Sequence, residues 1–480
     1  MNQEELRSLA MELPEDILKA KWCGDFERAE RMIDLYLQND RTPDCVKTRL
    51  EAERKVIRRL PGDYAYTRAQ ALAIVQKDIP DFTMEELESF IDMGKIDWIY
   101  IQGELHTATR FYETLVKVQP DIARRAGLIR EDFNETDTTR HREECLAIME
   151  DKGEIRAHIH LRARLELDEE AFKQEEILVH LPVPKPQKNM QNIRILKTFP
   201  ENGQDGAQVI IGGEEQRART VSFRQMMTEN HPFWVEYEYD SVMPLTDTTK
   251  APREQKRSEE AKAAAAAETY RQEDLMEVYP HIRFTDTVRA LCAEIKGEET
   301  DPLKVARRFY DYVTTKIVYS FMRGYYTLEE IPEYAMMGQK GDCGVQALTF
   351  ITLCRCAGIP ARWQSGLEVS PDYGQTKGEA GMHDWAMFYV EGYGWLFADC
   401  SYGGSAYRSG NLKLWNHYFG NLEEGRMAAN DAYQADLIPP KQYGRWDPYD
   451  NQAGEAEYTS GGLRGDQMDR TREILEYRYF

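Results

Sequence analysis

Gly341-Asp342-Cys343-Gly344-Val345-Gln346-Ala347 is the stretch that decides how the C-terminal half of the chain folds, because it runs directly into an apolar helical pattern. That pattern (Leu348, Phe350, Ile351, Leu353) predicts a helix ending at Gly358, with Pro360 just beyond it as a stop. Gly341 and Gly344 allow a sharp turn, so Cys343 is expected at the helix N-terminus. There the unpaired N–H groups and the helix dipole favour a thiolate over a thiol of ordinary pKa near ~8.5. The same N–H groups would stabilise an oxyanion.

A second stretch supplies the partners that a cysteine nucleophile needs. Gly381-Met382-His383-Asp384-Trp385 opens an apolar run to Val390, and the turn Glu391–Gly394 leads to Trp395-Leu396-Phe397-Ala398-Asp399. The pattern predicts a β-hairpin with His383 on its first strand and Asp399 near the end of its second. A thiolate requires a base that a third group orients, so we predict the catalytic triad Cys343, His383 and Asp399.

These motifs, together with Ala-Gly-Ile-Pro-Ala-Arg at 357–362, resemble the core of the transglutaminase-like superfamily, a papain-like cysteine fold. The order Cys, His, Asp matches, as do the gaps of 40 and 16 residues, and the similarity covers about 279–433. The resemblance is to the bacterial type, in which a β-sandwich precedes the core. Two positions depart from it: Asp384 stands where small residues are common, and Cys400 where proline is frequent. Neither departure removes a catalytic atom.

The residues around the triad are assigned less directly. The resemblance implies an oxyanion helper upstream of the cysteine, for which Gln339 is the nearest candidate. Asp342 is expected to cap the cysteine helix. Trp385 and Trp395 fit either the hairpin core or a substrate wall.

No metal or cofactor is predicted. The eight cysteines form no paired CxxC ligand sets, and no acidic loop has calcium-binding spacing. His158 and His160 share one strand face with three arginines, which favours a solvated face over a metal pair.

The whole chain is predicted to be an α+β multidomain protein. In 1–150 the apolar residues have helical spacing, which predicts a helical domain, and no motif there indicates a chemistry. In 151–246 apolar and polar residues alternate, which predicts an antiparallel β-sandwich. A charged, alanine-rich connecting helix is predicted at 247–275, the transglutaminase-like catalytic domain at 276–440, and a C-terminal extension at 441–480. The predicted sandwich strands are 155–167, 177–181, 193–196, 209–211, 221–223 and 233–239.

Composition restricts the partners. The formal charge of −22, from 61 basic and 83 acidic side chains, argues against nucleic acid or an anionic membrane as a partner. The N-terminus lacks the pattern of a secretion signal and no apolar run has the length of a membrane span, so a cytoplasmic location is expected. Oligomeric state is not indicated by the sequence.

The leading hypothesis is a cysteine acyl-transfer enzyme that cleaves peptide or side-chain amide bonds through a thioester, with water as the acceptor. A lysine amine as acceptor would instead make it a cross-linking transglutaminase with the same triad. A third reading is a non-catalytic binding or scaffold protein on the same fold. Removal of glycans from glycoproteins is disfavoured, because the deglycosylating branch of the superfamily carries a zinc-binding set of cysteines that this sequence lacks. The helical region 1–150 is expected to recruit substrates or mediate self-association.

Overall fold

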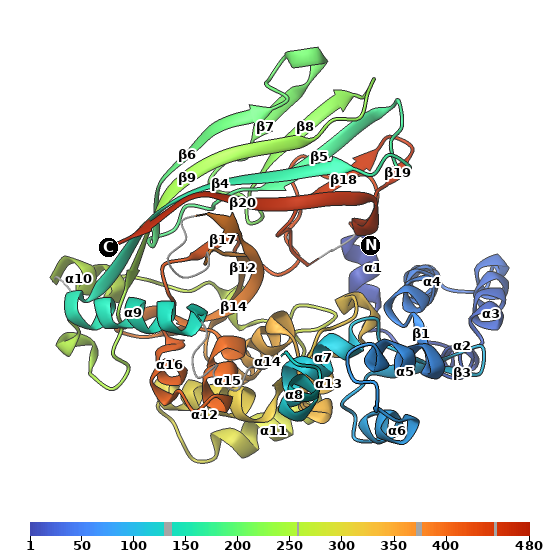
Figure 1. Cartoon of the computed structure of the whole chain (residues 1–480), viewed down its shortest axis with the longest axis horizontal. Helices are drawn as coiled ribbons and strands as arrows, with labels where there is room; N and C mark the ends of the chain where they lie inside the picture. The colour runs from blue at the N-terminus through green and yellow to red at the C-terminus, as the bar shows by residue number, and fades with distance from the viewer. Residues whose placement is uncertain (129–136, 257–258, 371–376, 446–448) are drawn as a thin grey trace. The chain divides into compact units, whose positions relative to one another are not determined.

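A computed structural model describes residues 1–128, 137–256, 259–370, 377–445 and 449–480 of the 480-residue chain (Figure 1). The chain forms two compact units. Unit 1 contains 1–134, 277–288 and 315–349, and unit 2 contains 135–276, 289–314 and 350–480. Three of the five boundaries along the chain fall inside helices: α11 (Asp286–Lys296), α12 (Pro302–Lys316) and α14 (Cys343–Cys356).

Unit 1 is mostly helical, as the spacing of its apolar residues predicts. Its helices are α1 (Gln3–Ser8), α2 (Glu15–Trp22), α3 (Phe26–Gln38), α4 (Asp44–Asp63), α5 (Arg68–Gln76), α6 (Met84–Asp92), α7 (Phe111–Val118), α8 (Pro120–Arg125) and α13 (Ile331–Gly338). Thr83 and Glu86 form a capping box at the start of α6: each residue's backbone N–H donates to the other's side chain, at 2.9 and 3.1 Å.

The region 1–150 also contains strands that the sequence did not predict. β1 (Tyr66–Thr67), β2 (Trp98–Ile101) and β3 (Glu104–Thr107) form an antiparallel sheet in the order β1-β3-β2. Gln102 and Gly103 connect β2 to β3 with φ angles of 51° and 80°, as in a tight two-residue hairpin. Glutamine rarely adopts a positive φ, so the sequence around Gln102 does not predict this turn.

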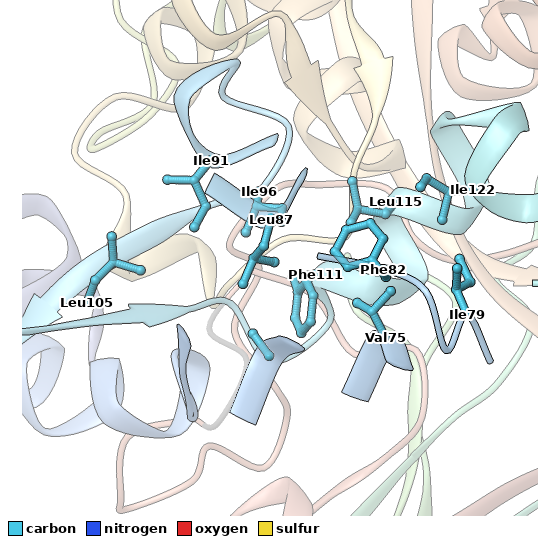
Figure 2. Close-up of a cluster of buried hydrophobic side chains, with 11 residues drawn as sticks. Val75, Ile79, Phe82, Leu87, Ile91, Ile96, Leu105, Phe111, Leu115 and Ile122 are labelled. Carbon is cyan, nitrogen blue, oxygen red and sulfur yellow. The ribbon is translucent and has the colours of Figure 1, made fainter. Parts of the chain in front are cut away.

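One buried hydrophobic cluster holds this part of unit 1 together (Figure 2). It draws side chains from α5, α6, β3, α7 and α8 and from the turns between them, and all are at most 5% exposed. The members are Ala71, Val75, Ile79, Phe82, Leu87, Ile91, Ile96, Leu105, Phe111, Leu115 and Ile122.

Unit 2 contains the predicted β-sandwich, built from two five-stranded sheets (Figure 1). All six predicted strands are confirmed: β4 (Glu154–Leu167), β5 (Glu176–Pro182), β6 (Met190–Phe199), β7 (Gln208–Ile211), β8 (Thr220–Met226) and β9 (Phe233–Pro244). One sheet has the order β13-β20-β4-β9-β6 and the other β19-β18-β5-β8-β7. Phe223 of β8 and Phe233 of β9 pack across the two sheets with ring centroids 5.6 Å apart.

Four strands of the sandwich come from outside 151–246. They are β13 (Gly378–Glu379), β18 (Glu455–Tyr458), β19 (Gly461–Gly462) and β20 (Met468–Tyr479). β20 pairs with β4 along nearly its whole length, from Met468 opposite Leu167 to Tyr479 opposite Ala157. The C-terminal segment therefore forms a central part of the sandwich.

A third five-stranded sheet of unit 2 is antiparallel and has the order β16-β15-β14-β12-β17. Its strands are β12 (Ala361–Glu368), β14 (Gly381–Val390), β15 (Gly394–Ala398), β16 (Phe419–Gly420) and β17 (Arg426–Asn430). The helices of unit 2 include α9 (Asp137–Lys152), α10 (Glu259–Ala266), α15 (Cys400–Arg408) and α16 (Leu412–His417). Among the described residues, no helix has the length and apolar character to cross a membrane.

The pairing of β20 with β4 predicts a stability effect at the C-terminal end of the chain. Ile474 is 1% exposed and pairs with Leu161, so Ile474→Ala should lower the free energy of unfolding by about 2 to 4 kcal/mol. Urea denaturation followed by tryptophan fluorescence measures the change. Arg478→Ala, on the exposed face of the same strand, should change it by less than about 1 kcal/mol. Equal effects of the two substitutions would contradict this packing.

Candidate active site

His383 and Asp399 form a buried pair at one end of the predicted hairpin, which the structure confirms as β14 and β15. The register places Ala386 opposite Ala398, and Asp399 follows directly after β15. His383 Nε2 lies 2.7 Å from Asp399 Oδ2. The two side chains are 4% and 0% exposed, so bulk water does not compete for this contact.

Both carboxylate oxygens of Asp399 have further partners. Oδ1 accepts hydrogen bonds from the backbone N–H of Tyr402 at 2.9 Å and from the hydroxyl of Ser401 at 3.1 Å, so Asp399 caps α15. Oδ2 lies 2.8 Å from Nη1 of Arg426. Burial alone would raise the pKa of Asp399, but His383 and Arg426 outweigh it and hold that pKa well below its usual range. Asp399 is therefore a carboxylate, and its contact with Nε2 fixes the orientation of the imidazole.

Arg426 is the residue of this site that the sequence analysis did not identify. Its guanidinium is fully buried, and besides Asp399 it binds Glu423, with Nη2 2.8 Å from Oε1. Arg142 of α9 continues the charge network, 3.7 Å from Glu423 and 3.6 Å from Glu368. Gly425-Arg426 belongs to the stretch that resembles the superfamily, but no local spacing connects Arg426 with Asp399.

Tyr402 holds the plane of the imidazole. Its ring stacks on His383 with centroids 4.6 Å apart and an interplanar angle of 19°. The guanidinium groups of Arg426 and Arg142 lie 4.4 and 4.1 Å from the same tyrosine ring. With Nε2 turned to Asp399, Nδ1 is the imidazole nitrogen suited to exchange a proton with a thiol.

Cys343 is the first residue of α14, as predicted, and lies in unit 1. Asp342 caps this helix: its Oδ1 accepts from the backbone N–H of Val345 at 3.0 Å and from the hydroxyl of Tyr325 at 2.6 Å. A Cβ at Gly341 would lie 2.3 Å from Val345 Cγ1, so the close turn before the cysteine requires glycine. Cys343 itself is half-buried.

Residues of the N-terminal region support the segment that leads into Cys343. Lys340 of β11 (Lys340–Gly341) donates to the carbonyl oxygen of Gly94 at 3.3 Å, and its Nζ lies 3.7 Å from Asp97. Asp97 also accepts from the hydroxyl of Tyr64 at 2.8 Å and lies 3.6 Å from Arg323. Burial alone would raise the pKa of Asp97, but the charges of Lys340 and Arg323 lower it below its usual value. Asp97 is therefore a charged carboxylate.

The three weaker site candidates have distinct positions. Gln339 is exposed and ends α13 in a left-handed conformation, with φ of 51°. Trp385 is buried in the hairpin core, and its indole N–H donates to Gln364 at 2.8 Å. Trp395 lies 3.9 Å from the Arg362 guanidinium and lines a cavity of about 890 Å³ in unit 2. Neither His383 nor Asp399 is among the residues that line this cavity.

Of the predicted triad, the structure brings His383 and Asp399 together. Cys343 belongs to the other compact unit, so its pairing with His383 stays a prediction. Asp384, one of the two departures, is buried and accepts a hydrogen bond from Gln452. Cys400, the other, is the buried first residue of α15.

Residues 289–400 match the family model of the transglutaminase-like superfamily. The matched segment contains all three predicted triad residues, and this part of the chain is a transglutaminase-like core. The chain is also similar to an uncharacterized protein of Haemophilus influenzae, with 26% identity over 195 residues, or 35% of this chain. It spans about half, 52%, of the length of that relative.

Solved structures with partial similarity include a proposed cysteine protease of Cytophaga hutchinsonii, at 13% identity and a TM-score of 0.36, covering 67% of this chain and 91% of that one. The periplasmic domain of TgpA from Pseudomonas aeruginosa has 15% identity and a TM-score of 0.26, over 54% and 92% of the two chains. Red sea bream transglutaminase has 14% identity and a TM-score of 0.20, over 50% and 46%.

The environment of Asp399 predicts how stability depends on pH. Because its pKa is lowered on folding, the carboxylate contributes fully above its unfolded pKa of about 4, and the contribution is lost as pH falls toward the folded pKa. Asp399→Asn should therefore lower the free energy of unfolding by about 3 to 5 kcal/mol at pH 7, because it removes the buried charge that pairs with both Arg426 and His383. Below pH about 4 the free energies of unfolding of Asp399→Asn and wild type should become more similar, because the wild type loses the contribution of its carboxylate.

Urea denaturation of both proteins across pH 3 to 7 measures this difference. Asp436→Asn, at an exposed aspartate, is the matched control and should follow the wild-type curve at every pH. A gap between Asp399→Asn and wild type that stays constant with pH would contradict the assigned charge state.

Proposed function

We propose that this protein is a cysteine acyl-transfer enzyme that hydrolyses peptide or side-chain amide bonds of a peptide or protein substrate. Cys343 is the nucleophile, His383 the general base and acid, and Asp399 the residue that orients His383. A cytoplasmic location stays a prediction.

The observation that carries this proposal is the buried His383–Asp399 pair. The imidazole of His383 lies against an ionised carboxylate and beneath a stacked tyrosine, so its ring is held in one orientation. An imidazole oriented in this way can accept the proton of a cysteine thiol and return it to a leaving group. A protein that used the fold only for binding would have no need of a buried, fully partnered carboxylate next to a histidine.

The position of Cys343 at the start of α14 also supports this proposal. Cys343 begins a 14-residue helix whose first turn is capped by Asp342, so backbone N–H groups point towards the thiol end of the helix. Further along the same helix, Phe350 packs on Phe388 of β14, the strand that carries His383, with ring centroids 5.6 Å apart.

The proposed reaction has two steps. The Cys343 thiolate attacks the carbonyl carbon, the C–N bond breaks, and the His383 imidazolium gives its proton to the leaving amine, which leaves a thioester. His383 then accepts a proton from water, whose oxygen attacks the thioester; the C–S bond breaks, and the acid and the Cys343 thiolate are released. A lysine amine in place of water would give a cross-link through the same intermediate, so the acceptor needs its own assay.

Cys343→Ala should lower turnover of a fluorogenic peptide library by about 10⁴-fold or more, since no other group forms the thioester. Cys45→Ala is the matched control, because Cys45 is exposed and lies outside the motifs; it should retain wild-type turnover. Turnover that survives in Cys343→Ala would overturn the assignment.

A parallel assay supplies a fluorescent primary amine together with a protein acceptor. Hydrolysis predicts peptide cleavage without incorporation of the amine, and cross-linking predicts incorporation. If wild type shows neither activity while Cys343 reacts like an ordinary thiol, the binding or scaffold alternative replaces the catalytic one.

A further inference from the structure

A second histidine–cysteine pair lies buried in unit 2, away from the triad residues in sequence. His141 and Cys145 are four residues apart on α9, so their side chains share one face of that helix. Glu424, from the turn before β17, and Tyr477 of β20 meet them there. All four are buried, at 6%, 1%, 0% and 3% exposure. Glu424 is 279 residues from Cys145, which is why no sequence motif marks the cluster.

The distances within the cluster match those between the ligands of one metal ion. His141 Nε2 lies 3.2 Å from Glu424 Oε1, and Cys145 Sγ lies 3.5 Å from that nitrogen and 3.3 Å from that oxygen. Around a tetrahedral zinc ion, N and O ligands are about 3.3 Å apart, and a sulfur is about 3.5 Å from either. The hydroxyl oxygen of Tyr477 lies 3.0 Å from His141 Nε2 and donates to Glu424 Oε1, so a fourth oxygen borders the cluster.

The electrostatics of the cluster favour a cation. Glu424 Oε2 is buried and has no hydrogen-bond partner within the part of the chain that the structure describes. A carboxylate taken out of water is costly unless a charge balances it.

We propose that His141, Cys145 and Glu424 bind one zinc-class divalent ion, with the Tyr477 hydroxyl as the fourth ligand. On binding, the Cys145 thiol gives its proton to solvent, and the ion is neutralised by the thiolate and the Glu424 carboxylate. Mixed sulfur, nitrogen and oxygen donors select zinc or cobalt over magnesium and calcium. Four protein ligands leave no open position, so the site is structural and not catalytic.

The ion would join three elements that are distant in the chain: α9, the turn before β17, and β20. Glu424 lies two residues from Arg426, which pairs with Asp399, and Arg142 on α9 packs on Tyr402, which stacks on His383. A bound ion would therefore stabilise the positions of residues that contact the His383–Asp399 pair. It does not depend on the proposed function, since it needs no reaction at Cys343.

Cobalt substitution of the full-length protein tests this site. After treatment with a chelator, the protein is titrated with Co²⁺, and absorption is recorded in the thiolate charge-transfer and ligand-field regions. Cys343→Ala is used in parallel to exclude the other Cys–His set. We expect one equivalent of Co²⁺ with a tetrahedral, thiolate-ligated spectrum in both proteins, displaced by one equivalent of Zn²⁺.

Cys145→Ser and His141→Ala should each weaken Zn²⁺ binding by about 100-fold or more, since loss even of groups that only orient ligands costs 10- to 100-fold. Cys145→Ser should also lose the thiolate band, whereas Cys45→Ser should bind like wild type. If a variant fails to fold, the wild-type and Cys343→Ala titrations still decide the matter. No Co²⁺–thiolate band in either protein, or a band that persists in folded Cys145→Ser, would overturn the proposal.

Discussion

The buried contact of Asp399 with Arg426 and His383 is the interaction on which the site depends. An aspartate at 0% exposure without a balancing charge would take up a proton, and a neutral acid would not stabilise an imidazolium. Arg426 supplies that charge, and Glu423, Arg142 and Glu368 extend the network through the interior of unit 2. Such networks are costly when one member is lost, so the orientation of His383 depends on residues of β15, β17 and α9 together.

Features encoded by neighbouring residues were predictable from the sequence. The alternation of apolar and polar residues from Ile155 to Leu167 predicts β4. The apolar runs bounded by glycines predict the hairpin that pairs His383 with Asp399. Features that join distant segments were not. β20 enters the sandwich from the C-terminal extension, and Arg426 meets Asp399 although no spacing relates them. His141 and Cys145 have the spacing of ligands on a helix, but only folding brings Glu424 and Tyr477 to them.

Residues of the N-terminal region contact the segment that leads into Cys343. Asp97 and Gly94 hold Lys340, three residues before Cys343, and Arg323 joins the same buried cluster through Tyr64 and Asp97. Unit 1 thus combines residues 1–134 with the segment that leads into Cys343, the proposed nucleophile, while unit 2 holds His383 and Asp399. Removing the N-terminal helices would expose apolar surface and also release β11, so loss of activity on truncation would not by itself demonstrate substrate recruitment.

The central claim is that Cys343, His383 and Asp399 act as one catalytic set, and the alkylation rate of Cys343 as a function of pH tests it most directly. The rate is followed by mass spectrometry in wild type and in His383→Ala. The account predicts that wild-type Cys343 reacts well below the pH of a free thiol, about 8.5, and that His383→Ala removes this advantage. A cysteine that is inert, or that titrates like an ordinary thiol in both proteins, would contradict it.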